Sequence, residues 1–171
     1  METQLFDGAG TAAALAMLAE GLAALAREQP GLALVGVRRG GAVLARRLAQ
    51  RLSLPVGEVD IGLYRDDAFS ARAQPLVGPS EIAFDVAGRP IALVDDVLYT
   101  GRTVRAAIDA VMDYGRPRRV WLFVLVDRGG RELPIQADLA GARVECGPGE
   151  QIDVRLVELG AAADAVVRVS R

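Results

Sequence analysis

The chain has 171 residues, of which 51% are hydrophobic and 25% are charged, and its formal net charge is −2. This length suits one domain with a sizeable core, so we predict a single domain over residues 1–171. The small negative charge excludes a global attraction to nucleic acid or to anionic membranes and leaves room only for a local basic patch.

Two residue types that catalyse many reactions are absent. The chain has no His, and all 20 basic residues are Arg, so it has no Lys. This composition removes the usual general base, Ser-His and Cys-His nucleophiles, His-ligated zinc and Schiff-base chemistry. Carboxylates, Arg, hydroxyls, backbone dipoles and a bound metal remain. That set suits substrates that carry phosphate, which Arg binds with a planar fork of donors.

The sequence predicts a cytoplasmic protein without a membrane partner. The first ten residues contain Glu2 and Asp7 and no basic residue, so they do not open a signal peptide, and no apolar run approaches transmembrane length. Cys146 is the single Cys, which permits no internal disulfide. We interpret it as a packing residue.

The first predicted element is a helix over residues 11–27, with Thr11 as its cap. Its Leu residues recur at spacings of three and four, and the other faces are largely Ala. A helix that is apolar nearly all round needs cover on more than one side. We interpret it as packed on a sheet, either as a plain core helix or with a further contact to a second subunit.

A buried strand is predicted over residues 32–37 and a helix over residues 42–52, joined by Arg38-Arg39-Gly40-Gly41. Such a loop at the start of a helix offers unpaired backbone N–H groups and the positive end of the helix dipole to an anion. The plainer alternative is a glycine turn with two solvated Arg side chains.

A third strand is predicted over residues 59–64 and a short one over residues 81–86. Between them, residues 65–79 show no periodicity, and a polar loop of this length in a compact domain is usually functional or disordered. Arg65 and Arg72 are candidates to close over a charged substrate and exclude water. The alternative is a disordered excursion with solvated Arg side chains.

The central stretch begins with a buried strand predicted over residues 91–94. Asp95 and Asp96 follow where we expect that strand to end, and a Thr-Gly-Arg-Thr loop then leads into a helix predicted over residues 104–114. Paired acids suit sugar hydroxyls or Mg²⁺, which takes oxygen ligands and favours phosphate partners. Acids at such a position can also be simple helix caps. The phosphate loop of nucleotide hydrolases is excluded because it requires Lys.

The most apolar strand is predicted over residues 120–126, with Trp121 and Phe123 on one face, and it ends in Asp127-Arg128. The carboxyl ends of parallel strands lie along one edge of an α/β sheet, where ligands bind. Three polar loops therefore meet at this edge, unless the last is only a surface turn held by Asp127 and Arg128.

Two C-terminal segments are predicted as strands. Apolar and polar residues alternate over residues 151–157, which indicates a strand with one exposed face, and we expect residues 165–169 to pair with it.

The two anion loops upstream of these segments suit one ligand with phosphates at both ends, such as a sugar phosphate that carries a separate diphosphate.

The run from Val94 to Thr103, Val-Asp-Asp-Val-Leu-Tyr-Thr-Gly-Arg-Thr, resembles the phosphoribosyl-diphosphate (PRPP) loop of type I phosphoribosyltransferases. Segments that begin at Asp60, Leu98 and Val126 resemble the PyrR branch of that family. The resemblance implies an α/β fold with a central, mostly parallel sheet flanked by helices, and a flexible hood loop. It also implies Mg²⁺-dependent conversion of uracil and PRPP to UMP and diphosphate, regulation of pyrimidine operon transcription, and a homodimer or larger oligomer.

The resemblance also implies roles for individual residues. Asp95 and Asp96 would be catalytic, holding the ribose hydroxyls and, directly or through water, the metal. Arg38, Arg39 and Gly40 would form the diphosphate loop, and Arg65 and Arg72 would lie on the hood loop. Asp127, Arg128 and Ile152 would frame the base. The implied PRPP-binding residues are Asp95, Asp96, Val97, Leu98, Tyr99, Thr100, Gly101, Arg102 and Thr103.

Members of this branch that bind messenger leader RNA are expected to use a basic face that includes the first helix. Here that helix offers Ala16 and Glu20 and no basic residue before Arg27. Gly130 and Gln136 replace a His and an Arg of the family pattern. RNA affinity depends on cationic contacts with phosphate, so these replacements argue against tight RNA binding.

Overall fold

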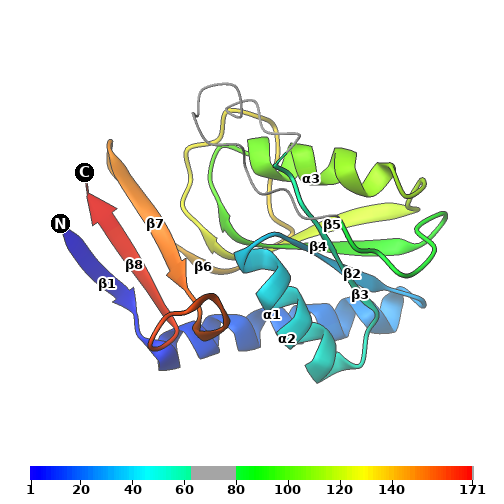
Figure 1. Ribbon diagram of the computed structural model, residues 1–171, viewed down its shortest axis with the longest axis horizontal. Coiled ribbons are helices and arrows are strands. Elements are labelled where there is room, and N and C mark those ends of the chain that lie inside the picture. Colours follow the sequence, from blue (N-terminus) through cyan, green and yellow to red (C-terminus); the bar gives the residue numbers. More distant parts are fainter. Residues whose placement is uncertain (63–79, 171) are drawn as a thin grey trace.

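The main sheet of the protein consists of five parallel strands in the order β3-β2-β4-β5-β6. The structure, a computed structural model, describes residues 1–62 and 80–170. The strands of this sheet are β2 (Ala33–Val37), β3 (Val56–Val59), β4 (Pro90–Leu98), β5 (Arg119–Asp127) and β6 (Leu139–Arg143). All carboxyl ends lie along one edge (Figure 1), which confirms the predicted α/β architecture.

A second sheet of three antiparallel strands stands beside the first (Figure 1). Its strands are β1 (Glu2–Phe6), β7 (Glu150–Arg155) and β8 (Ala165–Ser170), with β8 in the centre. The predicted pairing of the two C-terminal segments is confirmed. The sequence did not predict β1, whose partner is the far end of the chain: the Met1 amino group donates to the Ser170 carbonyl at 2.9 Å.

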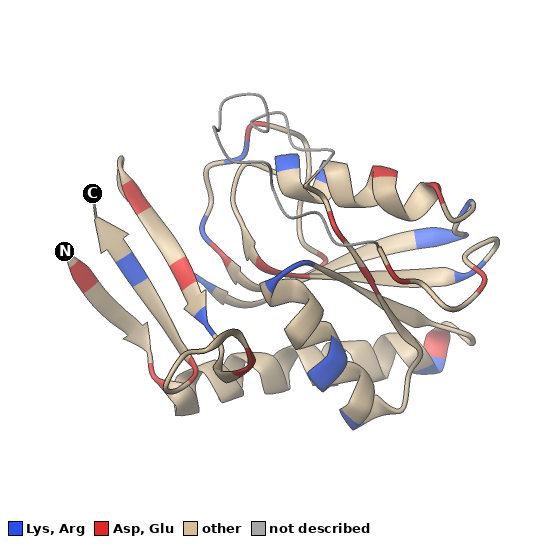
Figure 2. Ribbon diagram, viewed as in Figure 1, with Lys and Arg blue, Asp and Glu red and all other residues tan. Residues whose placement is uncertain are grey.

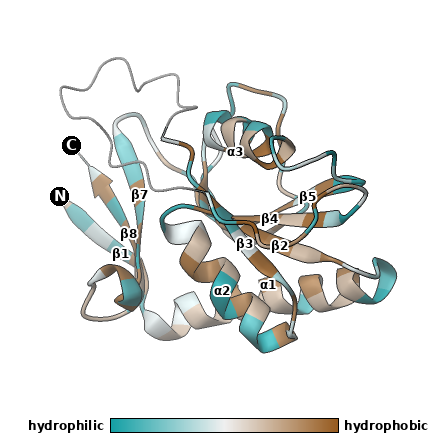
Figure 3. Ribbon diagram, turned by 45° about the vertical axis from the view of Figure 1, so that its right-hand side comes forward, coloured by the Kyte–Doolittle hydropathy of each residue, from teal (hydrophilic) through white to brown (hydrophobic). Residues whose placement is uncertain are grey.

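The helices cover both faces of the main sheet. α1 (Gly8–Glu28) and α2 (Gly40–Leu52) lie on one face, and α3 (Arg102–Met112) lies on the other (Figure 1). A short 3₁₀ helix, η2 (Val157–Leu159), connects β7 to β8. Hydrophobic residues concentrate on the central strands (Figure 3), because these strands are buried on both faces.

Each face of the sheet has its own apolar core. On the α1 and α2 side, Leu18, Leu22 and Leu44 pack with Trp121 and Phe123, which share a face as predicted. This core also contains Val154 and Val166 of the small sheet and Leu156, which directly follows β7. On the α3 side the core residues include Leu93, Val104, Val111 and Val124.

The N-terminus of α1 lies earlier than the sequence predicted. The Asp7 carboxylate, not Thr11, caps the helix by accepting a hydrogen bond from the Gly10 amide at 2.8 Å. Thr11 is buried one turn inside, where its hydroxyl donates to the Asp7 carbonyl at 2.8 Å. The first turn contains two glycines, whose helix propensity is low, so propensity alone predicted a later start for the helix.

By length and composition α1 is long and apolar enough to cross a membrane, which corrects our expectation that no segment approaches that length. A core helix of a soluble protein and an N-terminal signal sequence meet the same criterion. In this fold α1 packs along the sheet, and its buried positions are Thr11, Ala14, Leu18, Ala19 and Leu22.

Other predicted boundaries also differ from the structure. β4 continues through Leu98 instead of ending at residue 94, because its pairing with β5 persists to Leu98 and Asp127. β3 ends where the third strand was expected to begin, at Val59. The strand predicted over residues 81–86 is wrong beyond one bridge between Glu58 and Glu81. The predicted loop over residues 65–79, with Arg65 and Arg72, lies outside the described residues.

We expect Leu18→Ala to lower the free energy of unfolding by about 2–5 kcal/mol, because the side chain is fully buried between α1 and the sheet. Met112→Ala, in the last turn of α3, is the control, since Met112 is 53% exposed and its loss should change stability by less than about 0.5 kcal/mol. Urea titration of both variants measures the difference. Equal effects at the two positions would contradict the packing described for α1.

Candidate active site

The two acids of the central stretch lie within β4, not after it. Asp95 is 4% exposed, and its Oδ1 accepts a hydrogen bond from the Asp96 amide at 2.9 Å. Asp96 Oδ1 in turn accepts from the Val97 amide at 2.9 Å. Pairing between β2 and β4 stops at Gly36 and Val94, so beyond Val94 the β2 side of β4 is covered by a loop.

That loop is the segment Arg38-Arg39-Gly40-Gly41 at the start of α2. A Cβ at Gly40 would overlap the Asp96 carboxylate, and a Cβ at Gly41 would lie 2.9 Å from Asp95 Cα and closer still to the Val94 carbonyl. Only glycine allows this approach. The N-terminus of α2 therefore lies directly against the paired acids of β4.

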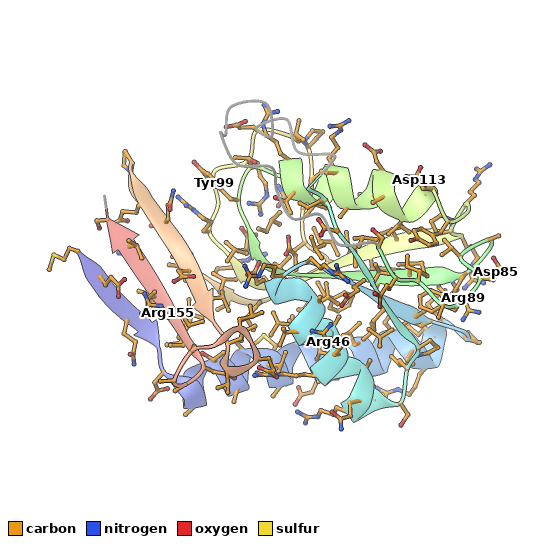
Figure 4. All side chains as sticks on the ribbon, viewed as in Figure 1. Arg46, Asp85, Arg89, Tyr99, Asp113 and Arg155 are labelled. Carbon is orange, nitrogen blue, oxygen red and sulfur yellow. The ribbon has the colours of Figure 1, made fainter. Side chains whose placement is uncertain are left out.

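The two Arg side chains of the loop differ in their environment. The Arg38 guanidinium binds Glu58, with Nε at 2.7 Å from Oε1, and lies 3.9 Å from Asp60. Arg46 of α2 contacts the same Glu58 carboxylate (Figure 4). Arg39 is exposed, and the structure gives it no ion pair among the described residues. Arg39 is thus better placed than Arg38 to bind a diphosphate with its side chain.

The loop between β4 and α3 forms the other end of the site. Gly101, with φ +93°, is the N-cap of α3, and the Arg102 amide donates to the Thr100 hydroxyl at 3.3 Å. The Arg102 side chain binds Glu132 at 2.8 Å. Leu98 is buried in the core, so its side chain does not reach a ligand. The helix N-terminus and the Thr hydroxyls remain as candidates for binding a phosphate.

The loop after β5 packs on the loop after β4. The Arg128 guanidinium lies over the Tyr99 ring, 3.9 Å from its centroid, in a cation–π contact. Gly130 lies against the same ring, where a Cβ would be 3.1 Å or less from ring carbons. The Glu132 and Leu133 amides both donate to the Thr100 carbonyl, at 3.0 and 3.1 Å. The phosphate side and the neighbouring polar loop are therefore one continuous surface.

A cavity of about 650 Å³ opens between this surface and the small sheet. Arg128 and Ile152, two of the three residues predicted to frame a base, line it together with Tyr99. Arg128 is 9% exposed, and its Nε has no hydrogen-bond partner in the described part of the chain. An unpaired buried donor is costly, so this cavity suits a ligand that supplies an acceptor.

Asp127, the third predicted base residue, does not line that cavity. Its carboxylate holds its own loop by accepting hydrogen bonds from the Gly129 amide at 3.0 Å and from Arg131 at 2.6 Å. Burial alone raises the pKa of Asp127, but the bonds from Arg131 and Gly129, with the nearby charge of Arg143, bring its pKa below the ordinary value. Asp127 is therefore an ionised structural anchor.

The cavity also has walls that the sequence did not indicate. Residues 146–149, including Cys146, form part of its lining just before β7. Cys146 was interpreted as a packing residue, yet it is half-buried at a cavity wall. The Gly-Pro-Gly turn at residues 147–149 was the available signal, because a tight turn of this kind brings the backbone close to a ligand.

The acids fit a magnesium ion only as part of a larger coordination shell. Among residues 1–62 and 80–170 no group of three or more His, Cys, Asp or Glu is arranged to hold a metal. Two adjacent carboxylates beside a phosphate loop match the habit of Mg²⁺, which takes one or two protein carboxylates and fills its shell with water and substrate oxygens.

We expect Gly41→Ala to weaken binding of PRPP at least tenfold, because the new methyl group would force the loop away from the Val94 carbonyl. Titration calorimetry with PRPP and Mg²⁺ measures the affinity. The control is Gly8→Ala, where a Cβ would meet nothing closer than 3.5 Å. Unchanged affinity of Gly41→Ala would contradict the close packing of loop and acids.

Comparison with known proteins agrees with this geometry. Residues 2–145 match the family model of the phosphoribosyl transferase domain. The "bifunctional protein PyrR" of Roseiflexus sp. is 46% identical over 171 aligned positions, which cover 96% of this chain and 93% of that protein. The protein of the same description from Herpetosiphon aurantiacus is 50% identical over 144 positions, covering 81% of this chain and 80% of the relative.

Solved structures show the same fold at low sequence identity. The hypoxanthine phosphoribosyltransferase of Trypanosoma cruzi superposes with a TM-score of 0.67 at 18% identity, over 98% of this chain and 96% of that one. A purine phosphoribosyltransferase from Pyrococcus horikoshii gives a TM-score of 0.58 at 24% identity, over 80% of this chain and 83% of the other. With the family model and the relatives of high identity, these findings place the chain in the PyrR family of type I phosphoribosyltransferases.

Proposed function

We propose that the protein transfers the phosphoribosyl group of PRPP to uracil, forming UMP and diphosphate in the presence of Mg²⁺. The observation that carries this proposal is the contact of the glycine loop before α2 with Asp95 and Asp96. It joins a diphosphate site, a ribose site and a phosphate site along one sheet edge, beside a cavity large enough for a base.

The chemistry follows from where charge develops. Breaking the bond between ribose and diphosphate leaves positive charge on the sugar and negative charge on the departing diphosphate. Asp95 and Asp96 would stabilise the sugar, while Arg39 and the N-terminus of α2 would stabilise the leaving group. Mg²⁺, held by the two acids directly or through water, would supply further positive charge at the diphosphate. No step requires His or Lys.

The 5′-phosphate would bind at the other helix N-terminus. Thr100, Gly101 and Thr103 present hydroxyls and backbone amides there, and Tyr99 closes the loop toward the cavity (Figure 4). Arg102 would contribute through its backbone, because its side chain is bound to Glu132. Val97 and Leu98 would act through the strand that positions the loop.

The base would enter the cavity between Arg128 and Ile152. The buried Nε of Arg128 has no hydrogen-bond partner among the described residues, and a carbonyl oxygen of uracil would provide one. Ile152 of β7 would cover the apolar face of the ring. The arrangement supports a base with exocyclic oxygens, and the PyrR resemblance is what selects uracil among such bases.

We expect UMP to form from uracil, PRPP and Mg²⁺, and we expect Asp96→Asn to lower kcat about 100-fold, because it removes a charge that stabilises the transition state. Chromatographic separation of UMP from uracil measures the rate. Asp85→Asn, at an exposed carboxylate outside the site, is the control. A preference for hypoxanthine or guanine over uracil would show a transferase for another base.

The relatives are described as bifunctional, and we propose regulation of pyrimidine operon transcription, responsive to UMP, as the second function. Its partner would be a messenger leader RNA. The surface offers few cations to such an RNA, because α1 carries almost no charge along most of its length (Figure 2). Arg131 is 14% exposed and is occupied by Asp127 and the Tyr99 carbonyl, whereas Arg143 is exposed.

The same helix supports assembly in the cytoplasm as a homodimer or larger oligomer. α1 leaves apolar residues uncovered, among them Met17, which is 49% exposed. A second copy of the chain packed on that face would remove them from water.

We expect leader RNA to bind weakly, with a shallow dependence of affinity on salt, because each lost phosphate contact lowers the slope of log K against log salt by about 0.9 for duplex contacts and less for single strands. Filter binding between 50 and 300 mM KCl, with and without UMP, measures this slope. Arg143→Gln should weaken the residual binding and lower the slope by about one contact's share. Nanomolar, UMP-dependent binding would show that regulation is the main function.

A further inference from the structure

The base cavity is built from both sheets of the protein. One wall belongs to the main sheet and its loops, through Val97, Tyr99 and Arg128. The opposite wall belongs to β7 of the small sheet, through Gln151 and Ile152. The width of the cavity therefore depends on how the small sheet is held against the rest of the molecule.

Apolar contacts and one polar cluster connect the small sheet to the helical layer. Val154, Leu156 and Val166 enter the core beneath α1 and α2. Apolar packing is not directional, so by itself it permits small rotations of the sheet about this contact. The polar cluster lies beside it, between α2 and the connection from β7 to β8, where basic and acidic positions face one another (Figure 2).

Arg47 is the centre of that cluster. Its Nε donates to Glu158 Oε1 at 2.8 Å, and its Nη2 donates to Asp164 Oδ1 at 3.1 Å, with further contacts to the second oxygen of each carboxylate. Asp164 Oδ1 also accepts from the Val157 amide at 3.0 Å. One planar guanidinium thus binds both ends of the connection, a geometry that Lys would not reproduce.

The electrostatics agree with this geometry. Hydrogen bonds to Asp164 and Glu158 raise the pKa of the Arg47 guanidinium, and the bonds from Arg47 lower the pKa of both carboxyls. The side chains of Arg47 and Asp164 are 26% and 21% exposed. Partial burial makes this pair less sensitive to screening than a fully exposed one, but not insensitive.

α2 carries Arg47 less than two turns beyond the glycine loop that touches Asp95 and Asp96. The helix has 13 residues and packs against β2 and β4, so its position is determined by the main sheet. Because Arg47 anchors the β7–β8 connection to this helix, the position of the connection is fixed relative to Asp95 and Asp96.

We propose that Arg47, with Glu158 and Asp164, is a positioning residue that sets the distance of β7 from the main sheet and thereby the width of the base cavity. It touches no substrate. The proposal takes the cavity as the base site and so rests on the proposed function. It goes further by assigning base affinity to a contact just beyond the carboxyl end of β7, whereas the cavity is lined by the start of that strand.

Arg47→Met keeps an unbranched apolar side chain and removes the guanidinium group. We expect KM for uracil to rise five- to tenfold, while KM for PRPP and kcat stay within twofold. Arg51→Met, at an exposed position in the last turn of the same helix, is the matched control and should change nothing. Equal increases in both KM values would overturn the proposal, because they would indicate general loosening of the site.

Cys146 provides a readout that does not depend on catalysis. It is the single Cys of the chain and lines the cavity, so its rate of reaction with a thiol reagent such as DTNB reports the opening of that cavity. We expect Arg47→Met to change this rate at least threefold and Arg51→Met to leave it unchanged. An unchanged rate in Arg47→Met would overturn the proposal even if the wild type forms no UMP. Absence of UMP with an altered rate would refute the proposed function alone.

Further variants keep the proposal testable if Arg47→Met does not fold, and test whether Arg47 and Asp164 act together. If Arg47→Met fails to fold, Asp164→Asn removes one half of the contact and should give a smaller effect in the same direction. When both changes fold, their combination should add little to Arg47→Met, because they break the same contact. Arg47→Lys should restore less than half of the loss. Full additivity of Arg47→Met and Asp164→Asn would contradict a shared role.

Discussion

The close approach of the glycine backbone before α2 to strand β4 is the constraint on which the site depends. β2 stops pairing with β4 at Val94, while β5 continues to pair with it through Leu98. Beyond Val94 this edge of β4 carries Asp95 and Asp96, and glycine at positions 40 and 41 is what lets the loop before α2 approach them so closely. A single clash there would separate the positive end of α2 from the acids and so divide a joined site into two weak ones.

Without Lys or His, Arg serves both structure and chemistry. Arg38, Arg47 and Arg131 are held by carboxylates within the fold. Arg128 lies over Tyr99, with an Nε that has no partner in the part of the chain that the structure describes, and Arg39 is exposed. Arg cannot be deprotonated near neutral pH, so none of these groups takes a proton in the reaction. The protein therefore acts by fixed charge, and its pH dependence in the neutral range would come from the ligands.

Much of the architecture was predictable because it rests on local patterns. Buried runs such as residues 32–37 and 120–126 and the glycine and threonine loops that follow strands identify a parallel sheet with ligands at one edge. The strand β1 was not predictable in this way, since it pairs with β8 at the other end of the chain. Nor was β6, whose five residues are mostly Ala, Gly and Leu and carry little strand preference.

The candidate site also has features that local sequence predicts and features that it does not. Placing Asp95, Asp96 and the glycine loop together required only strand topology, but the partner of each Arg depended on distant residues. Arg38 binds Glu58, twenty positions away, and Asp127 turns into its own loop toward Arg131. Local sequence predicts neither ion pair, because side chains of opposite charge are abundant and only the folded backbone determines which of them lie close enough to pair.

The order of strands in the small sheet has a consequence for synthesis of the chain. β8 is its central strand, and of the three strands it is made last and β1 first; within residues 1–62 and 80–170, β7 pairs with no strand other than β8. The loops proposed to bind PRPP are complete once β5 and the loop after it have emerged. The wall proposed to face the base requires β8, so a chain truncated before β8 would present the proposed phosphate-binding loops without a finished base cavity.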